Sequence, residues 1–288
     1  MFLVLIFVLV SAGLKAAGPP GSEKASFEKA HDLYLHTEYR ESLKVLLALQ
    51  ARDAQALELL GEDYFMLGEY KKATDALEKA AAMGATSEEV YVWLGRAYGR
   101  RAETAGPFTA PGNATHARKM FEKAVEMNLT NHEAAGDLLD YYLDAPAFLG
   151  GGMTKAEELA KKVGAVDPPE GQYLMAQIEE KRKRYDAAEQ HLRRAVELAP
   201  RQVSRLLPLA LHLAKHGRTK ESDAVFAEAE SLEPRNPRLV FYRAETYVES
   251  QRNLEDARKL LREYIALPLT PDDPPRESAQ ALLGKIQP

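Results

Sequence analysis

The chain has 288 residues, of which 45% are apolar and 28% are charged, and its formal net charge at pH 7 is −5. This composition is ordinary for a globular or repeat protein, and the mild negative charge argues against nucleic acid as a partner, because nucleic-acid-binding surfaces are strongly basic. The sequence contains no cysteine. It therefore excludes disulfides, thiolate nucleophiles, cysteine metal ligands and a lipid-modified cysteine.

The N-terminal segment, residues 1–21, has the pattern of a targeting sequence. An apolar run extends from Met1 to Leu14, and the small residues Ala16, Ala17 and Gly18 follow it. The run is shorter than the roughly 20 residues that span a membrane, and this order is typical of a secretory signal peptide. No Lys or Arg precedes the run, so an uncleaved anchor stays open, as does a buried first helix of the fold. We expect residues 1–21 to be a signal peptide or an anchor. The protein is then exported, periplasmic or secreted, and contacts a membrane only if the segment is uncleaved.

A pattern of small and large residues returns along the chain at a fixed spacing, which is typical of repeat architectures. Leu60-Gly61-x-x-Tyr64 recurs as Leu94-Gly95-x-x-Tyr98. The apolar spacing in each unit predicts two amphipathic helices. We expect the small residues to lie where two helices cross closely and the large ones to fill the space beside them. The second half of the unit also recurs, with Ala188, Leu192, Ala195 and Pro200 returning as Ser222, Phe226, Ala229 and Pro234.

These residues resemble the tetratricopeptide repeat (TPR) family. The resemblance implies an all-α fold, a right-handed superhelical TPR-like solenoid of antiparallel helix pairs. One pair cannot bury its apolar face alone, so neighbouring pairs stack and the end of the array needs a cap. We expect about seven repeats within residues 22–273 and a capping helix within residues 274–288. The seven units run roughly over residues 23–53, 54–87, 88–131, 132–168, 169–202, 203–236 and 237–270.

Two insertions interrupt the repeat, near residues 99–113 and 144–154. The first adds ten residues and the second adds five, and both fall between the two helices of a unit. We expect the helix after the first insertion to resume at about Ala114. Insertions at one place in a repeat map to one face of a solenoid, often a binding face. The two loops are therefore either contacts for a ligand or partner, or longer turns whose aromatic side chains pack into the nearest helix groove.

No motif in the sequence supplies catalytic machinery. His212 and His216 share a helix face, but Lys215 between them repels a cation, so we interpret both as surface histidines. The run Gly150-Gly151-Gly152 lacks the spacing of a phosphate-binding loop. We therefore expect no enzyme activity, no catalytic residue, no cofactor and no metal.

Recognition is the function that this fold class favours. A stack of helix pairs has a concave surface lined by the first helix of each unit, and in TPR proteins this groove typically holds a peptide or a partner helix. The asparagines of the clamp that binds chaperone tails are missing, so we do not expect a partner of that class. The expected groove is acidic at first and aromatic later, which favours a peptide with basic and apolar residues. Its inward positions are Glu58, Glu62, Val92, Arg96, Gly136, Asp140, Tyr173, Gln177, Phe241 and Glu245.

We therefore expect an exported TPR scaffold or adaptor that binds another protein or peptide in the assembly of a cell-envelope complex. The alternative is a small-ligand or glycan-binding module that uses the two inserted loops. A third hypothesis is an accessory domain that only builds a multimer. The candidate partner-binding residues are Arg96, Arg100, Phe108, Phe148, Leu149, Tyr173, Gln177, Phe241 and Glu245.

Overall fold

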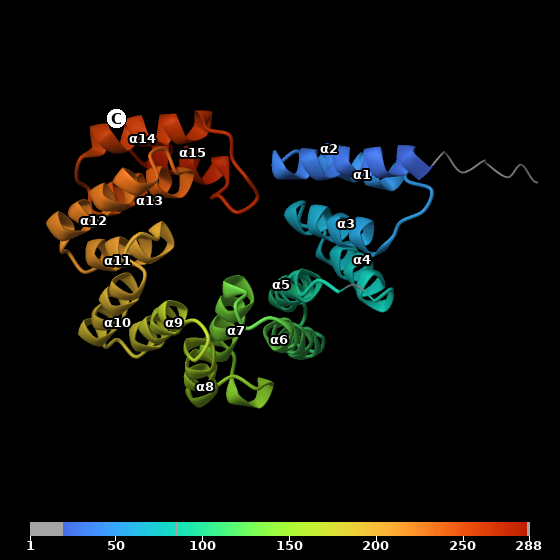
Figure 1. Cartoon of the computed structure of the whole chain (residues 1–288), viewed down its shortest axis with the longest axis horizontal. Coiled ribbons are helices and arrows are strands. Elements are labelled where there is room, and N and C mark those ends of the chain that lie inside the picture. Colours follow the sequence, from blue (N-terminus) through green and yellow to red (C-terminus); the bar gives the residue numbers. More distant parts are fainter. Residues whose placement is uncertain (1–19, 85, 287–288) are drawn as a thin grey trace, which may run out of the picture.

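The structure, a computed structural model, describes residues 20–84 and 86–286, and every regular element in them is a helix (Figure 1). The expected signal peptide or anchor lies outside these residues, apart from the two that begin α1. Over the described ranges, no helix is both long and apolar enough to cross a membrane. The helices are α1 (Pro20–Leu35), α2 (Tyr39–Ala48), α3 (Ala54–Met66), α4 (Tyr70–Ala82), α5 (Glu89–Thr104), α6 (Ala110–Met127), α7 (His132–Asp144), the 3-10 helix η1 (Ala147–Leu149), α8 (Met153–Gly164), α9 (Pro168–Lys181), α10 (Tyr185–Leu198), α11 (Val203–Lys215), α12 (Thr219–Leu232), α13 (Pro237–Glu249), α14 (Leu254–Ala266) and α15 (Arg276–Lys285).

The helices pack in consecutive pairs, from α1 with α2 to α13 with α14, and α15 packs on the last pair. The first helices of successive pairs also contact one another, as α5 contacts α7 and α7 contacts α9. These first helices form the inner layer of a curved array, and the second helices form its outer layer (Figure 1). The array curls into a nearly closed ring in which the last helices face α1 and α2. The expected all-α solenoid is therefore confirmed.

Glycines allow the two helices of a pair to approach closely. A Cβ atom added to Gly61 of α3 would lie 2.4 Å from Cγ of Leu77 on α4. One added to Gly95 of α5 would lie 2.3 Å from the ring of Phe121 on α6. Both large side chains are buried, so each fills the space that the missing Cβ leaves. The repeated glycine of the sequence pattern therefore marks a helix crossing.

The turn between the two helices of a unit repeats in backbone conformation even where its residue changes. Lys183, Gly217 and Gln251 all have a positive φ, of 61°, 76° and 52°. A residue in this left-handed region ends the first helix and turns the chain back for the second. Successive positions of the three are one repeat length apart, so the turn follows the repeat more strictly than its residue type does.

The first insertion is more helical than the sequence predicts. A loop was expected over residues 99–113, but α5 continues to Thr104 and α6 begins at Ala110. Pro111 lies in the first turn of α6, where a proline's missing N–H would have no helical partner in any case. The irregular segment thus shrinks to residues 105–109. The second insertion stays irregular apart from the short helix η1, and its Gly150 lies against the Arg118 side chain of α6.

The C-terminal helix α15 covers the apolar side of the last pair. Ala279, Leu282 and Ile286 are buried against residues of α13 and α14. Arg276 at the start of α15 donates hydrogen bonds to the backbone oxygens of Ile265 and Leu267. The segment between α14 and α15 then extends towards the inner face of the ring, which it helps to enclose.

Candidate binding groove

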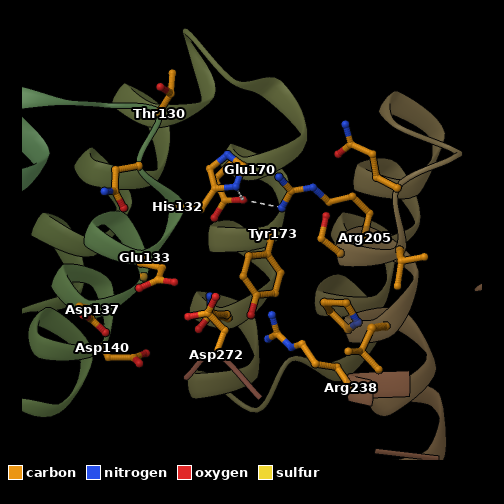
Figure 2. Close-up of a pocket in the computed structure, with 18 of the residues that line it drawn as sticks. Thr130, His132, Glu133, Asp137, Asp140, Glu170, Tyr173, Arg205, Arg238 and Asp272 are labelled. Atoms are coloured by element: carbon orange, nitrogen blue, oxygen red, sulfur yellow. Dashed lines mark hydrogen bonds and ion pairs between the residues drawn. The ribbon is translucent and has the colours of Figure 1, made fainter. Parts of the chain in front are cut away.

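A cavity of about 1090 Å³ lies on the concave face, where the inner helices curve around it. Its walls come from α5, α7, α9 and α11, from the turns before α11 and α13, and from Pro271 and Asp272 of the segment before α15. Figure 2 shows the carboxylates of α7 on one side, Arg205 and Arg238 on the other, and Tyr173 between them. Seven carboxylates and four arginines line the cavity, so acidic groups are in excess.

Arg96 connects two units at the acidic wall. It lies on α5, and its guanidinium donates to Asp137 at 2.6 Å and to Glu133 at 2.8 Å, both on α7. The same guanidinium lies 5.0 Å from the ring centroid of Trp93, a distance at which a cation interacts with an aromatic face. Burial raises the pKa of Asp137, although Arg96 opposes this shift. Arg96 is therefore neutralised within the wall and adds little positive potential to the groove.

A buried ion pair joins the fifth and sixth units. Arg205 of α11 donates to Glu170 of α9, and both side chains are almost fully buried (Figure 2). His132 of α7 lies beside this pair, with Nε2 2.8 Å from Asp167 and Nδ1 3.7 Å from Glu170. Burying two charges is unfavourable unless they are paired, so Arg205 and Glu170 serve each other rather than a ligand.

Other carboxylates of the inner face have no cation at ion-pair distance. Among the described residues, no Lys or Arg forms an ion pair with Glu89, Asp140 or Asp272, although more distant cations lower their pKa values: Arg96 for Glu89, Lys181 for Asp140, and Arg238 with Arg96 for Asp272. Desolvation in the groove, together with the charges of Asp137 and Asp144, raises the pKa of Asp140 to about 6. Desolvation also raises the pKa values of Glu89 and Asp272.

The acidic band continues along α3 towards the first unit. Desolvation raises the pKa of Glu58, and neighbouring Glu89 and Glu88 add to the shift against a hydrogen bond from Ser87. Burial, with repulsion from Glu58 and Glu89, raises the pKa of Glu62 to about 8, although a hydrogen bond from Tyr34 opposes it. The inner face thus repels further negative charge from α3 to α7 and favours a cation.

Two segments of the chain match family models described as tetratricopeptide repeat, one over residues 169–202 and one over residues 207–274. Over these two segments the chain consists of TPR repeats. A search of curated proteins finds no match.

Solved TPR structures share the fold. A thermophilic TPR protein of Thermus thermophilus is 22% identical, with a TM-score of 0.51 over 66% of this chain and 98% of that one. A tetratricopeptide repeat protein of Parabacteroides merdae is 15% identical, with a TM-score of 0.55 over 92% of this chain and 99% of that one. At these identities the likeness shows the TPR fold alone.

Three of the sequence-predicted partner-binding residues lie in the groove of this TPR array. Arg96, Tyr173 and Gln177 all line the large cavity. Glu245 is half-buried on α13, where burial and the charge of Glu249 raise its pKa. Phe241 lies elsewhere than expected, because it is buried against Tyr242 and Tyr264 and has only 4% of its surface exposed. It therefore offers no surface to a partner.

The other predicted residues lie in and beside the inserted loops. Phe108 is 97% exposed and Phe148 is 82% exposed, so neither ring packs into a helix groove. Of the two interpretations of the loops, the one in which these aromatic side chains tuck against a helix is therefore wrong. Arg100 pairs with Glu103 and lies 5.4 Å from the ring centroid of Tyr70. Leu149 is half-buried, and its carbonyl accepts a hydrogen bond from Tyr141.

Helix rotation explains which groove residues the sequence reasoning missed. Val92 was expected to face inward, but it is fully buried, and Glu89, Trp93 and Arg96 of the same helix line the cavity instead. These three positions follow the three- and four-residue steps of one helix face. No pattern in the sequence predicts that Asp272 lines the cavity. Its segment lies outside the repeat, and its position depends on the curvature of the array.

The interpretation of His212 and His216 as surface residues is also wrong. His212 is 6% exposed, so it is buried, and His216 is half-buried. Lys215 binds Glu180 of α9 at 2.9 Å and points its charge at that carboxylate. The pair therefore belongs to the contact between α9 and α11.

Proposed function

We propose that this TPR protein is a scaffold that binds a segment of another protein in its concave groove, and that the segment carries basic and apolar residues. The observation that carries the proposal is the set of groove carboxylates that form no ion pair, among them Glu89, Asp140 and Asp272, whose pKa values stay raised although cations lie further away. Their raised pKa values show that their surroundings disfavour the ionised carboxylates. The ammonium or guanidinium groups of a ligand would stabilise these negative charges.

The rest of the groove suits the other parts of such a segment. Trp93 and Tyr173 offer aromatic surface for apolar side chains and for cation–π contact. Arg201 and Arg238 line the opposite wall, where they favour an acidic group of the same segment. This division of charge gives the ligand a direction, with its basic part against α5 and α7 and any acidic part towards α11 and α13.

A direct test uses a fluorescent peptide of alternating Lys and Leu and its Glu–Leu counterpart as probes. We expect the full chain to bind the Lys–Leu peptide and not the Glu–Leu peptide in fluorescence anisotropy. The double variant Glu89→Gln/Asp140→Asn should raise the Kd of the Lys–Leu peptide roughly tenfold, because two unpaired carboxylates are neutralised. Raising the ionic strength from about 0.05 to 0.2 M should weaken binding as well.

The matched control removes two charges from the outer layer. Glu228 of α12 and Glu263 of α14 are exposed, and Glu228→Gln/Glu263→Gln changes the net charge by the same amount. This variant should keep the parent's Kd. An equal loss of affinity in both double variants would show that only the net charge matters, and it would contradict binding in the groove.

Export is the second part of the proposal and depends on the leader. We propose that residues 1–21 direct the chain out of the cytoplasm, to a periplasmic or secreted location, where it acts in the assembly of a cell-envelope complex. The apolar run and the small residues after it support this. N-terminal sequencing of the protein from its own source tests it, since an intact Met1 on a cytoplasmic protein would contradict export.

The inserted loops support an alternative, a ligand-binding or glycan-binding surface outside the groove. Its specific observation is the exposure of Phe108 and Phe148, whose rings are open to contact with a ligand. The variant Phe108→Ala/Phe148→Ala distinguishes the two sites. It should leave the affinity for the Lys–Leu peptide unchanged if the groove binds, and it should abolish capture of the natural partner if the loops bind.

A further inference from the structure

Three side chains converge where the ends of α9 and α11 meet, away from the acidic wall of the groove. Oε1 of Glu180 lies 2.5 Å from Nδ1 of His212 and 3.3 Å from Nε2 of His216. One ligand atom from each residue lies within 4.8 Å of the other two. Across the described part of the chain, this is the one group of three His or carboxylate residues with such an arrangement.

Hydrogen bonding accounts for only part of the cluster, because Nε2 of His216 bonds to Oε1 of Glu180 at 3.3 Å whereas Nδ1 of His212 has no hydrogen-bond partner. Nδ1 of His212 is buried, and its close approach to Glu180 is not aligned as a hydrogen bond. The second carboxylate oxygen of Glu180 accepts from Lys215 at 2.9 Å, which leaves Oε1 facing the two imidazoles. A buried polar atom without a partner is costly, so this nitrogen calls for another explanation.

We propose that Glu180, His212 and His216 form a site for a divalent zinc ion. Two imidazole nitrogens and one carboxylate oxygen are a ligand set that Zn²⁺ favours, with metal–ligand distances of roughly 2.0–2.2 Å. Ligand atoms at those distances in a tetrahedron are roughly 3.3–3.5 Å apart. The separation between Glu180 and His216 already has this length, and a side-chain rotation of Glu180 would open the shorter one.

Neighbouring side chains also act on the site. The ring of Tyr185 lies 4.3 Å from that of His216 and holds its orientation. Lys215 is the one unfavourable neighbour, because its ammonium repels a metal ion bound to the same carboxylate.

The site would serve two purposes. It would fasten α9 of the fifth unit to α11 of the sixth and so fix the angle between them. Glu180 and His212 also line a second cavity of about 490 Å³, together with Asp144 and Tyr173. Three protein ligands leave the fourth position of a tetrahedral zinc ion open to this cavity, where water or a donor group of a partner can bind.

Calorimetric titration of the full chain with Zn²⁺ tests the site. We expect one ion to bind per chain, and Co²⁺ in its place to give the visible absorption of a tetrahedral complex. His216→Ala and Glu180→Gln should each weaken binding about tenfold or more. Lys215→Met should strengthen it roughly threefold to tenfold, because it removes the repelling charge and keeps the side-chain stem.

The control is His191→Ala, which removes a half-buried histidine of α10 that bonds to Gln172 at 2.7 Å. It should bind zinc like the parent. If Glu180→Gln loses its helical circular dichroism, the opposite shifts of His216→Ala and Lys215→Met still carry the test. Equal affinity in the parent, His216→Ala and His191→Ala would overturn the site, and so would no binding by the parent at about 1 mM Zn²⁺.

Discussion

Asp63 and Glu62 are neighbours on α3 whose surroundings both oppose their negative charge. Asp63 is fully buried, and burial raises its pKa to about 7 although Ser42 opposes the shift. Burial raises the pKa of Glu62 to about 8. These are the two unspecified positions of the motif Leu60-Gly61-x-x-Tyr64, so the repeat pattern predicts their helix and says nothing of their charge.

Stability should therefore fall as the pH rises from 5 to 8. In that window the unfolded chain has already released the proton of Asp63, whose ordinary pKa is 3.8, while the folded chain still holds it. Raising the pH through about 7 ionises the buried group and removes the stability that its protonated form contributes. Urea unfolding at pH 5 and pH 8 should differ by about 2–3 kcal/mol from Asp63 alone.

Replacement of the buried acid by its amide tests this assignment. Asp63→Asn should reduce the change in unfolding free energy between pH 5 and pH 8, because the amide does not titrate. Asp75→Asn is the control, since Asp75 is exposed on α4 and pairs with Lys71 at 2.8 Å. A pH dependence that is the same in both variants would show that Asp63 is not the titrating group.

The packing of a helix pair depends on whether a glycine faces the partner helix. Helix α5 contains one glycine that does and one that does not. Gly95 faces Phe121 at a helix crossing, whereas nothing lies within 4 Å of a Cβ added to Gly99, one turn later. The repeat pattern identified Gly95 as a crossing residue because Gly61 occupies the same place one repeat earlier. It assigned Gly99 to a loop, because the prolines and glycines that follow resemble loop sequence. In the structure, packing against the neighbouring helices extends α5 through Gly99 to Thr104.

The same substitution at these two glycines should have opposite effects. Gly95→Ala should lower the free energy of unfolding by about 1–3 kcal/mol, because its methyl group overlaps the ring of Phe121. Gly99→Ala should raise it by about 0.5–1 kcal/mol, because alanine favours a helix interior and meets nothing there. Denaturant unfolding of both variants measures this. Equal changes of one sign would contradict the crossing.

The whole array is enclosed by its own C-terminal segment. Asp272 lines the cavity with residues of α5 and α7, and its charge also acts on Tyr34 and Tyr39 of the first unit. The ring therefore brings the last helices close to the first, across most of the sequence. On the inner face, desolvation is the largest cause that raises the pKa values of Glu62 and Asp140 above their ordinary range.

The array also depends on the helix that ends it. Leu282 of α15 is buried against the last pair, whereas Gln280 on the same helix is exposed. Leu282→Asp should detach α15 and expose apolar surface of α13 and α14, because a repeat array without its cap has an uncovered end. Light scattering should then show mass that increases with concentration. Gln280→Asp should stay like the parent, and association in both variants would exclude loss of the cap as its cause.

Sequence alone predicted the helix pairs and the crossings, because the same local contacts recur in every repeat. Gly61 with Leu77 and Gly95 with Phe121 are separated by few residues, so spacing suffices to predict them. Tertiary structure decided the groove. The rotation of α5 about its axis decides that Trp93 and not Val92 lines the cavity. The angles between successive units decide that Asp272 reaches the cavity and that Glu180 lies beside His212. Such contacts depend on angles between units, which no short pattern in the sequence encodes.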